Sequence, residues 1–204
     1  RRLSLMVMVE RGPKIGPKHQ HGGTAMEHYA AIDVSLEWSS ICIVDTSGRI
    51  VREAKVRSER EAVVAFFQVC RRFMTVPGVG AVVAMTFKSA IDQPERFQHS
   101  KAVGAHFGLT PRKYQSGEVD RTGRISKVGD AAVRTALFEA ANILLTRAAR
   151  WSSLKAWALR VATRQGMKKA KVALARKLAV VLHRMWLDGT QFRWGSQAAP
   201  EAVA

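Results

Sequence analysis

Acidic residues are scarce in one half of this 204-residue chain. The whole chain has 33 Lys and Arg against 16 Asp and Glu, for a net charge of +17. Residues 104–194 hold eighteen basic and five acidic residues, whereas residues 26–103 hold ten and nine. Charge distributed so unevenly attracts a polyanion to one half of the molecule. The composition therefore favours nucleic-acid binding, the alternative being a solvated basic surface such as that of a ribosomal-type protein.

Cysteines and long apolar runs are also few. Cys42 and Cys70 are the two cysteines, and they lack the spacing of metal ligands. They are expected to be core or bystander thiols in a reducing compartment. No apolar run approaches the roughly 20 residues that a membrane-spanning helix needs. These absences exclude a disulfide scaffold, a cysteine-based zinc site and a membrane span formed by one long apolar segment.

The two ends of the chain lack a periodic pattern. Residues 1–25 combine Gly-Pro pairs with His19 and His21, and no carboxylate or cysteine supports these histidines as metal ligands. We predict a disordered leader over residues 1–25, with Met26 as an earlier start of the chain. Residues 195–204 are predicted to be a disordered tail.

Residues 27–73 have the pattern of three short strands and a helix. Apolar residues alternate over 29–36 and 50–56, and residues 40–44 are rich in β-branched residues. A helix is expected from about Ser58, with Glu61 in the capping-box position. The first strand contains Asp33. One edge of this strand is expected to have no partner strand and to be exposed for pairing.

Residues 74–194 are predicted to be mostly helical. The glycine-containing segment 76–80 precedes an apolar run and resembles a helix-hairpin-helix, in which Gly78 and Gly80 would let the backbone approach a phosphate. The alternative is an ordinary glycine-rich turn. Further helices are predicted over 97–107, 131–150 and 168–186, the second of them capped by Asp130 or Gly129.

Residues 110–130 are predicted to form a polar loop around Ser116. A serine surrounded by cations can attack a DNA phosphate, because guanidinium groups stabilise the charge of the transition state. The alternative is a simple turn, and Ser126 is a rival serine. The cations expected to contact DNA are Arg112, Lys113, Arg121, Arg124, Lys127 and, from the next helix, Arg134.

Several short motifs occur in one order along the chain. They are Ala31-Ile32-Asp33-Val34-Ser35, Val76-Pro77-Gly78-Val79-Gly80, Gln115-Ser116-Gly117, Ile125-Ser126-Lys127-Val128-Gly129, Arg134 and Ala140-Ala141. Over residues 27–194 the chain resembles the DEDD-type insertion-sequence transposases, a family that includes the bridge-RNA-guided recombinases. The resemblance implies that Asp33 is the first of four acidic ligands of Mg²⁺ and that Ser116 is the nucleophile. It also implies DNA and possibly a guide RNA as partners, homo-oligomers or hetero-oligomers with an intact transposase, and a bacterial cytoplasmic, nucleoid-associated location.

The chain departs from this family in its middle. The Glu and the two later Asp of the family have no counterpart here, which indicates an internal deletion near residues 70–74. The predicted fold class is therefore α+β, with a partial ribonuclease-H-like β-β-β-α unit at 27–73 and an all-α, helix-hairpin-helix-like unit at 74–194. The expected function is DNA transposition with a defective catalytic site. The alternative is a DNA-binding remnant that acts as a dominant-negative partner of intact transposase.

Overall fold

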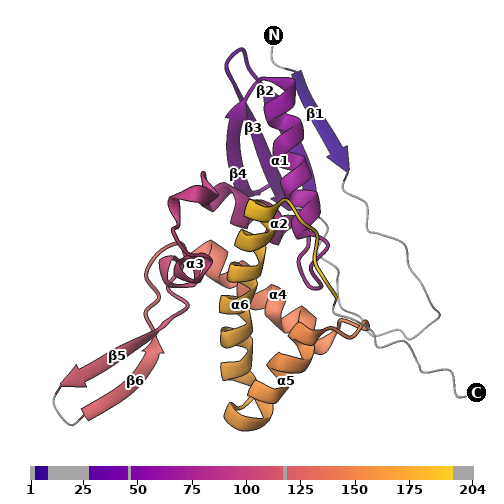
Figure 1. Cartoon of the computed structure of the whole chain (residues 1–204). Helices are drawn as coiled ribbons and strands as arrows, with labels where there is room; N and C mark the ends of the chain where they lie inside the picture. The colour runs from indigo at the N-terminus through magenta and orange to yellow at the C-terminus, as the bar shows by residue number, and fades with distance from the viewer. Residues whose placement is uncertain (1–2, 9–27, 46, 117–118, 195–204) are drawn as a thin grey trace, which may run out of the picture.

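The chain opens with a four-stranded antiparallel sheet covered on one face by a helix (Figure 1). A computed structural model describes residues 3–8, 28–45, 47–116 and 119–194. The sheet has the order β1-β2-β3-β4, and the helix α1 follows its last strand. The bounds are β1 Leu3–Met8, β2 His28–Val34, β3 Trp38–Asp45, β4 Ile50–Arg57 and α1 Arg60–Phe73.

The alternating pattern of the strands explains which face of the sheet is covered. Ile41 and Ile43 of β3 are buried, as are Phe66 and Phe73 of α1. Ile32 of β2 lies opposite Ile41 in the register, so it belongs to the same face. The β-β-β-α order predicted from the sequence is confirmed for β2 to α1.

The strand β1 corrects one prediction. Leu3–Met8 pairs with β2 from Leu3↔Val34 to Met8↔Tyr29, so disorder over the whole of residues 1–25 is wrong for this stretch. These six residues carry no helix signal, and their backbone supplies hydrogen-bond partners to the edge of β2. That edge was predicted to be exposed. The rest of the predicted leader, with His19 and His21, and the tail 195–204 lie outside the described residues.

The remaining helices pack around the long helix α6. Their bounds are α2 Ala81–Ala90, the 3-10 helix η1 Pro94–Arg96, α3 Ser100–His106, α4 Ala131–Thr146, α5 Ser153–Gln165 and α6 Met167–Asp188. The predicted helices at 131–150 and 168–186 are confirmed with slightly different ends, and a shorter helix lies within 97–107. The helix α5 was not predicted. It begins where Ser152 accepts a hydrogen bond from the Lys155 amide at 3.2 Å.

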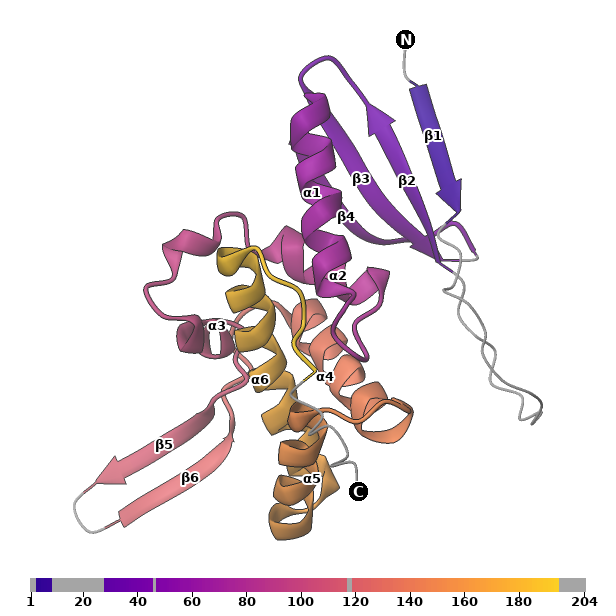
Figure 2. The same cartoon turned by 45° about the vertical axis from the view of Figure 1, so that its right-hand side comes forward.

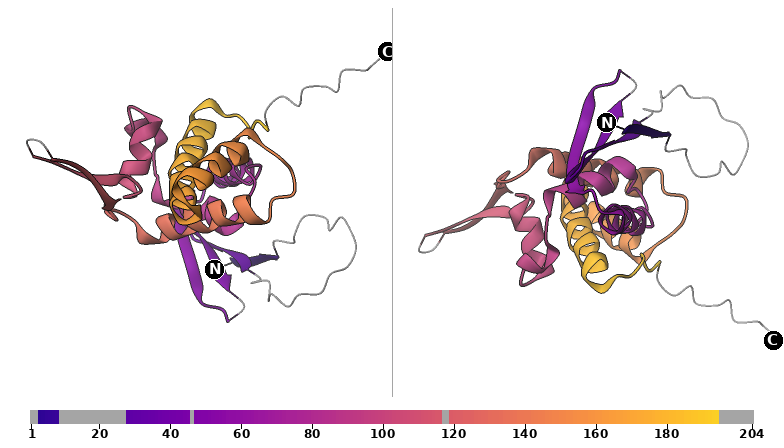
Figure 3. Two further views of the ribbon diagram at one scale, coloured as in Figure 1. Left: turned by 90° about the horizontal axis from the view of Figure 1, so that it is seen from below. Right: turned by 90° about the horizontal axis from the view of Figure 1, so that it is seen from above.

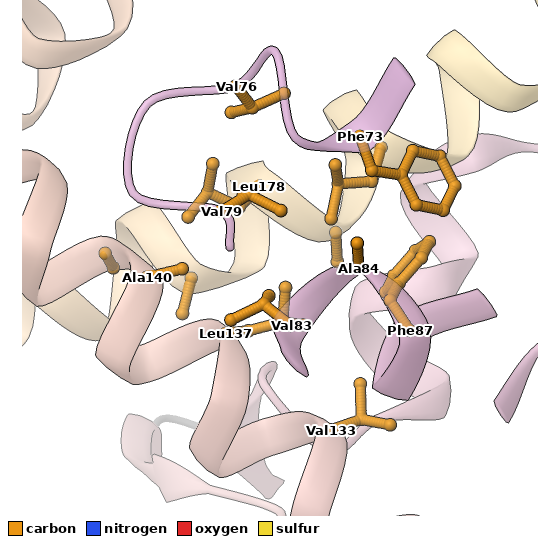
Figure 4. Packing of buried hydrophobic residues seen from close by; sticks show 14 of the residues in the cluster. Phe73, Val76, Val79, Val83, Ala84, Phe87, Val133, Leu137, Ala140 and Leu178 are labelled. Atoms are coloured by element: carbon orange, nitrogen blue, oxygen red, sulfur yellow. The ribbon is translucent and has the colours of Figure 1, made fainter. Parts of the chain in front are cut away.

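One hydrophobic core joins the sheet to the helices. Figure 4 shows the part of it in which Phe73 of α1 meets α2, α4 and α6. Phe73 at the end of α1 lies 5.5 Å from Phe87 of α2 and 5.8 Å from Trp186 of α6, measured between ring centroids. The buried cluster continues from Ile41 to Met185. The core therefore crosses the boundary between residues 73 and 74 at which the sequence predicts two domains.

Residues 110–130 form a β-hairpin rather than a loop. Strand β5, Pro111–Ser116, pairs antiparallel with β6, Val119–Ile125. The prediction of an all-α unit after residue 74 is therefore wrong. Pairs such as Tyr114↔Arg121 and Lys113↔Thr122 place β-forming residues opposite polar ones, and such a ladder satisfies backbone groups that a loop leaves to water. The hairpin projects away from the helices (Figures 2 and 3).

The described part of the chain contains no helix with the length and apolar character needed to cross a bilayer. Its fold is a mixed α/β structure with two small sheets.

Candidate nucleic-acid interface

The β5–β6 hairpin presents its side chains to solvent. All residues of Pro111–Ser116 are exposed, and so are Arg121 and Arg124 of β6. Ser116 is paired with Val119 at the end of β5 that lies away from the helices (Figure 2). A two-stranded ribbon of this kind fits the major groove of DNA. The hairpin therefore has the shape of an arm that can reach a duplex.

The cations of the hairpin are positioned differently from one another. Lys113, Arg121, Arg124 and Lys127 are exposed. Arg112 donates from Nη2 to the carbonyl oxygen of Ser126 at 3.1 Å. None of the three ion pairs found within the described ranges involves a hairpin cation. Four of the six cations predicted to contact DNA are thus free to face a phosphate, whereas Arg112 also bonds to the backbone that follows β6.

Arg134 holds the hairpin at its base instead of projecting to solvent. Its Nη1 lies 3.1 Å from the carbonyl oxygen of Phe107, 3.2 Å from that of Val128 and 3.4 Å from that of Gly129. These carbonyl oxygens belong to the two segments that enter and leave the hairpin. We call residues 106–110 and 126–130 the hairpin base. Arg134 was predicted to contact DNA. In the structure its guanidinium instead bonds to carbonyl oxygens of the hairpin base.

Backbone contacts close the hairpin base. The amide of Ser126 donates to Thr110 at 2.9 Å, and the amide of Lys127 donates to Gly108 at 3.1 Å. Gly129 has φ +82°, and a Cβ placed there would collide with the carbonyl oxygen of His106. Only glycine combines this φ with so close an approach. The two candidate serines lie at opposite ends of the hairpin, because Ser126 is in the hairpin base and Ser116 is at the far end of β5.

Asp130 connects the hairpin base to α4 and to the sheet. Its carboxylate accepts hydrogen bonds from the amides of Ala132 at 2.8 Å and Val133 at 3.3 Å, which confirms Asp130 as the cap of α4. It also pairs with Arg52 of β4 at 3.1 Å. Partial burial alone would raise the pKa of Asp130. The two amides and the Arg52 guanidinium outweigh that effect and lower the pKa below its usual value of 3.8.

The segment 76–80 packs into the core. Val76 and Val79 are 1% and 5% exposed, and Figure 4 shows both beside Leu178 of α6. Gly78 has φ +86°, and a Cβ there would collide with the carbonyl oxygen of Ala140 in α4. Close packing on α4 thus accounts for Gly78. Gly80 is exposed and precedes α2, where a Cβ would meet nothing within 4 Å.

Asp33 lies on the sheet face that α1 does not cover. It pairs with Ser40 of β3 and Ser4 of β1, one residue out of step with the buried face that contains Ile41. Its Oδ1 is buried and has no hydrogen-bond partner among the described residues. Within the same residues no group of three or more His, Cys, Asp or Glu could hold a metal ion. The described side chains therefore do not form a Mg²⁺ site by themselves.

The structure does not bring the two predicted catalytic residues together. The sheet that contains β2 and the hairpin that contains β5 extend from different ends of the helical part in each view (Figures 1, 2 and 3). Ser116 is thus remote from Asp33 within one chain.

A second basic region lies in the last helices of the chain. Residues 140–187 contain eleven Lys and Arg and no Asp or Glu. Lys168 and Lys169 are exposed at the start of α6, whereas Arg176 covers Gly104 of α3 and Lys177 lies 4.2 Å from the ring centroid of Trp157. The absence of acids over this length identifies the region in the sequence.

Residues 70–158 match the sequence model described as the transposase IS116/IS110/IS902 family. Residues 70–158 are thus similar to this family, and we call them the transposase-family segment. The matched residues run from the end of α1 through the hairpin into α5, so they include Ser116, Gly78, Gly80 and Arg134 but not Asp33.

The chain is also similar to individual transposases. The transposase for insertion sequence element IS1111A of Coxiella burnetii is 31% identical over 139 residues, which are 68% of this chain and 38% of that protein. The transposase for insertion sequence element IS1328 of Yersinia enterocolitica is 30% identical over 61% of this chain and 38% of its own length. The putative transposase y4pF/y4sB of Sinorhizobium fredii is 30% identical over 60% of this chain and 32% of its own length. The chain thus spans less than two fifths of the length of each of these relatives.

Proposed function

We propose that this chain binds DNA as part of the transposition machinery of an insertion sequence. The observation that supports this most directly is the exposed basic β5–β6 hairpin, which lies inside the transposase-family segment and is fixed at its base by Arg134. The DEDD and bridge-RNA character implied by the sequence motifs belongs to the same proposal.

The hairpin would lie along a DNA groove. Lys113, Arg121 and Arg124 would contact phosphates, which position the protein and make its affinity dependent on salt. The hairpin base would hold this arm at a fixed angle to α4. Gly80, which is exposed before α2, would be a further backbone contact with a phosphate, since free amides at a helix N-terminus favour anions.

Ser116 would be the nucleophile of this arm. Its hydroxyl would lose a proton and Oγ would form a bond to a backbone phosphorus. The bond from phosphorus to one sugar oxygen would break, and that oxygen would take up a proton. The product would be a phosphoserine link, and the hairpin cations would stabilise the charge that develops on the phosphate.

The described residues do not assemble a site for Mg²⁺. Asp33 is the proposed ligand from a ribonuclease-H-like unit, supported by the unpartnered Oδ1. The other carboxylates of such a site would have been lost in the internal deletion. We therefore propose that this chain binds DNA but does not cut it alone. Joined to an intact transposase in a hetero-oligomer, with or without a guide RNA, it would act as a dominant-negative subunit.

The test is DNA binding measured by fluorescence anisotropy at several salt concentrations. We expect Arg121→Ala/Arg124→Ala to weaken binding to a duplex and to reduce the slope of log K against log[salt] by about 2. The matched control is Arg60→Ala/Arg71→Ala, which removes two exposed arginines from α1. Equal losses for both double variants would show that net charge, not the hairpin, determines binding.

A second measurement tests the chemistry. The chain is incubated with element-end DNA, Mg²⁺ and a candidate guide RNA, and covalent adducts are trapped in denaturant. We expect no adduct from the chain alone. An adduct that disappears in Ser116→Ala would establish Ser116 as nucleophile and contradict the proposed defect.

A further inference from the structure

A second aromatic and basic surface lies on the side of the molecule away from the hairpin. The connection between α4 and α5 and the segment that follows α6 meet there, opposite the hairpin in Figures 1 and 3. We call this surface the Trp151 patch, and its residues are Arg147, Arg150, Trp151, Arg193 and Trp194. Neither the proposed DNA contact nor the proposed chemistry uses it.

Trp151 is an exposed ring on a well-supported backbone. Its side chain is 62% exposed. The next residue, Ser152, is buried and caps α5, and Lys155 donates from Nζ to the carbonyl oxygen of Ala148 at 2.6 Å. These contacts fix the backbone on both sides of Trp151. The ring is therefore held in solvent by the fold, which is a costly arrangement for a large apolar side chain.

Three exposed arginines belong to the two segments of this patch. Arg147 and Arg150 are exposed in the same connection, and the Arg150 guanidinium carbon lies 4.2 Å from the ring centroid of Trp194. The Trp194 segment is itself held in place, because the amide of Phe192 donates to Thr75 Oγ1 at 2.9 Å. Arg193, between these two residues, is exposed. The patch thus combines one free aromatic face with three cations.

The charges determine which partner fits. Residues 140–187 contain no carboxylate, so the arginines beside Trp151 are not neutralised from within that stretch. A second copy of this chain would bring its own net charge of +17 towards the same cations. A single nucleic-acid strand supplies both a phosphate for arginine and an unpaired base whose face can stack on an indole ring. The bases of a duplex are already stacked on each other and cannot do so.

We infer that the Trp151 patch binds single-stranded nucleic acid. One unpaired base stacks on Trp151, and the adjoining phosphates contact Arg147 and Arg150. The surface is separate from the hairpin, so a single strand and a duplex can be held on opposite sides of the molecule.

The experiment uses the full chain and three fluorescent probes, namely a 20-nucleotide oligo-dT, a 20-nucleotide oligo-rU and a mixed-sequence 20-base-pair duplex. We expect Trp151→Ala to weaken single-strand binding roughly tenfold and to leave duplex binding unchanged. Trp151→Phe retains an aromatic face and should recover most of the affinity. Trp38→Ala is the matched control, because Trp38 is 50% exposed and lies beside Arg57, with 5.8 Å between the ring centroid and the guanidinium carbon.

The outcomes separate this inference from the proposed hairpin contact. Loss of oligo-dT or oligo-rU binding in Trp151→Ala supports the proposed role of the patch. The probe that the unchanged chain binds more tightly shows whether the patch prefers DNA or RNA. Unchanged single-strand affinity in Trp151→Ala, or equal loss in Trp38→Ala, overturns it. A loss of self-association in Trp151→Ala, measured by sedimentation, without a change in single-strand affinity would show that the ring contacts protein instead. Duplex binding that depends on Arg121 and Arg124 can succeed or fail independently of these results.

Discussion

Segments 76–80 and 110–130 lie in opposite environments. Both contain glycine between candidate helices, and the sequence predicts a DNA contact for both. In the structure Val76 and Val79 are buried and Gly78 lies against α4, whereas every residue of β5 is exposed. The difference follows from the neighbours of the glycines, which are valines in the first segment and arginines and lysines in the second. Glycine alone shows that the backbone comes close to something, and the flanking residues indicate whether that is another helix or solvent.

The largest expected effect comes from Gly78. Gly78→Val places a β-branched side chain at φ +86° and against the carbonyl oxygen of Ala140. We expect a loss of at least about 3 kcal/mol in the free energy of unfolding, measured in urea. Gly80→Ala is the control, with φ −94° and open space around it, and should cost under about 1 kcal/mol. Similar losses for both variants would contradict the buried role of the first segment.

Arg134 tests whether the hairpin is held from its base. Arg134→Ala removes charge-assisted hydrogen bonds and leaves the carbonyl oxygen of buried Phe107 without this donor, at a cost of about 1–3 kcal/mol. The amides of Ser126 and Lys127 should then exchange faster with deuterium. Arg124→Ala, on the exposed strand β6, should leave this exchange unchanged. Unaltered protection in Arg134→Ala would mean that backbone contacts alone close the hairpin base.

Asp130 gives a dependence on pH. Since the folded-state pKa is lowered, its ion pair and cap add stability above the unfolded value near 3.8, and this contribution is lost as the pH falls through the folded pKa. Asp130→Asn keeps the cap but loses the charge, so it should be destabilised at pH 7 by about 1 kcal/mol. The difference from the unchanged chain should shrink as the pH is lowered from 7 to below 3.8 and through the folded-state pKa. A difference that stays constant over this range would exclude the carboxylate charge as its cause.

The smallest effect on stability is expected for the exposed side chains of the hairpin. Arg121→Ala should change the free energy of unfolding by less than about 0.5 kcal/mol. The same substitution should reduce the salt dependence of duplex binding by about one unit of slope. Gly78→Val should lower the free energy of unfolding strongly. At a temperature where this variant is folded, the salt dependence of its duplex binding should be unchanged. A stability loss in Arg121→Ala as large as that of Gly78→Val would remove the distinction between the two segments.

Local signals in the sequence predicted much of the fold. The alternation in 29–56, the capping residue Asp130 and the apolar stripes of α4 and α6 each depend on near neighbours in the chain, and all of them appear in the structure. The strand β1 could not be predicted in this way, because it forms only by pairing with the edge of β2 twenty residues later. The hairpin was missed for a related reason, since its cross-strand pairs occur in a segment whose glycines and charges also suit a loop.

The candidate site was less predictable than the fold. Charge and exposure of Lys113, Arg121 and Arg124 agree with what the sequence suggests. The contact of Arg134 with Phe107 and the packing of Gly78 on Ala140 join residues far apart in the chain, so no local pattern reveals them. The role of Ser116 and that of Asp33 stay predictions, because both rest on the chemistry of a bound DNA.

Arg52 has a consequence for how this molecule can be divided. From the last strand of the sheet its guanidinium reaches Ser89 Oγ at 2.8 Å in α2 and Asp130 at 3.1 Å at the start of α4. A gene fragment that begins after residue 73 would leave Phe87 and Trp186 without Phe73, and Asp130 without its counter-charge. The strands and the helices thus share one buried core, and removing the sheet with α1 would expose aromatic rings of the helices that this core now covers.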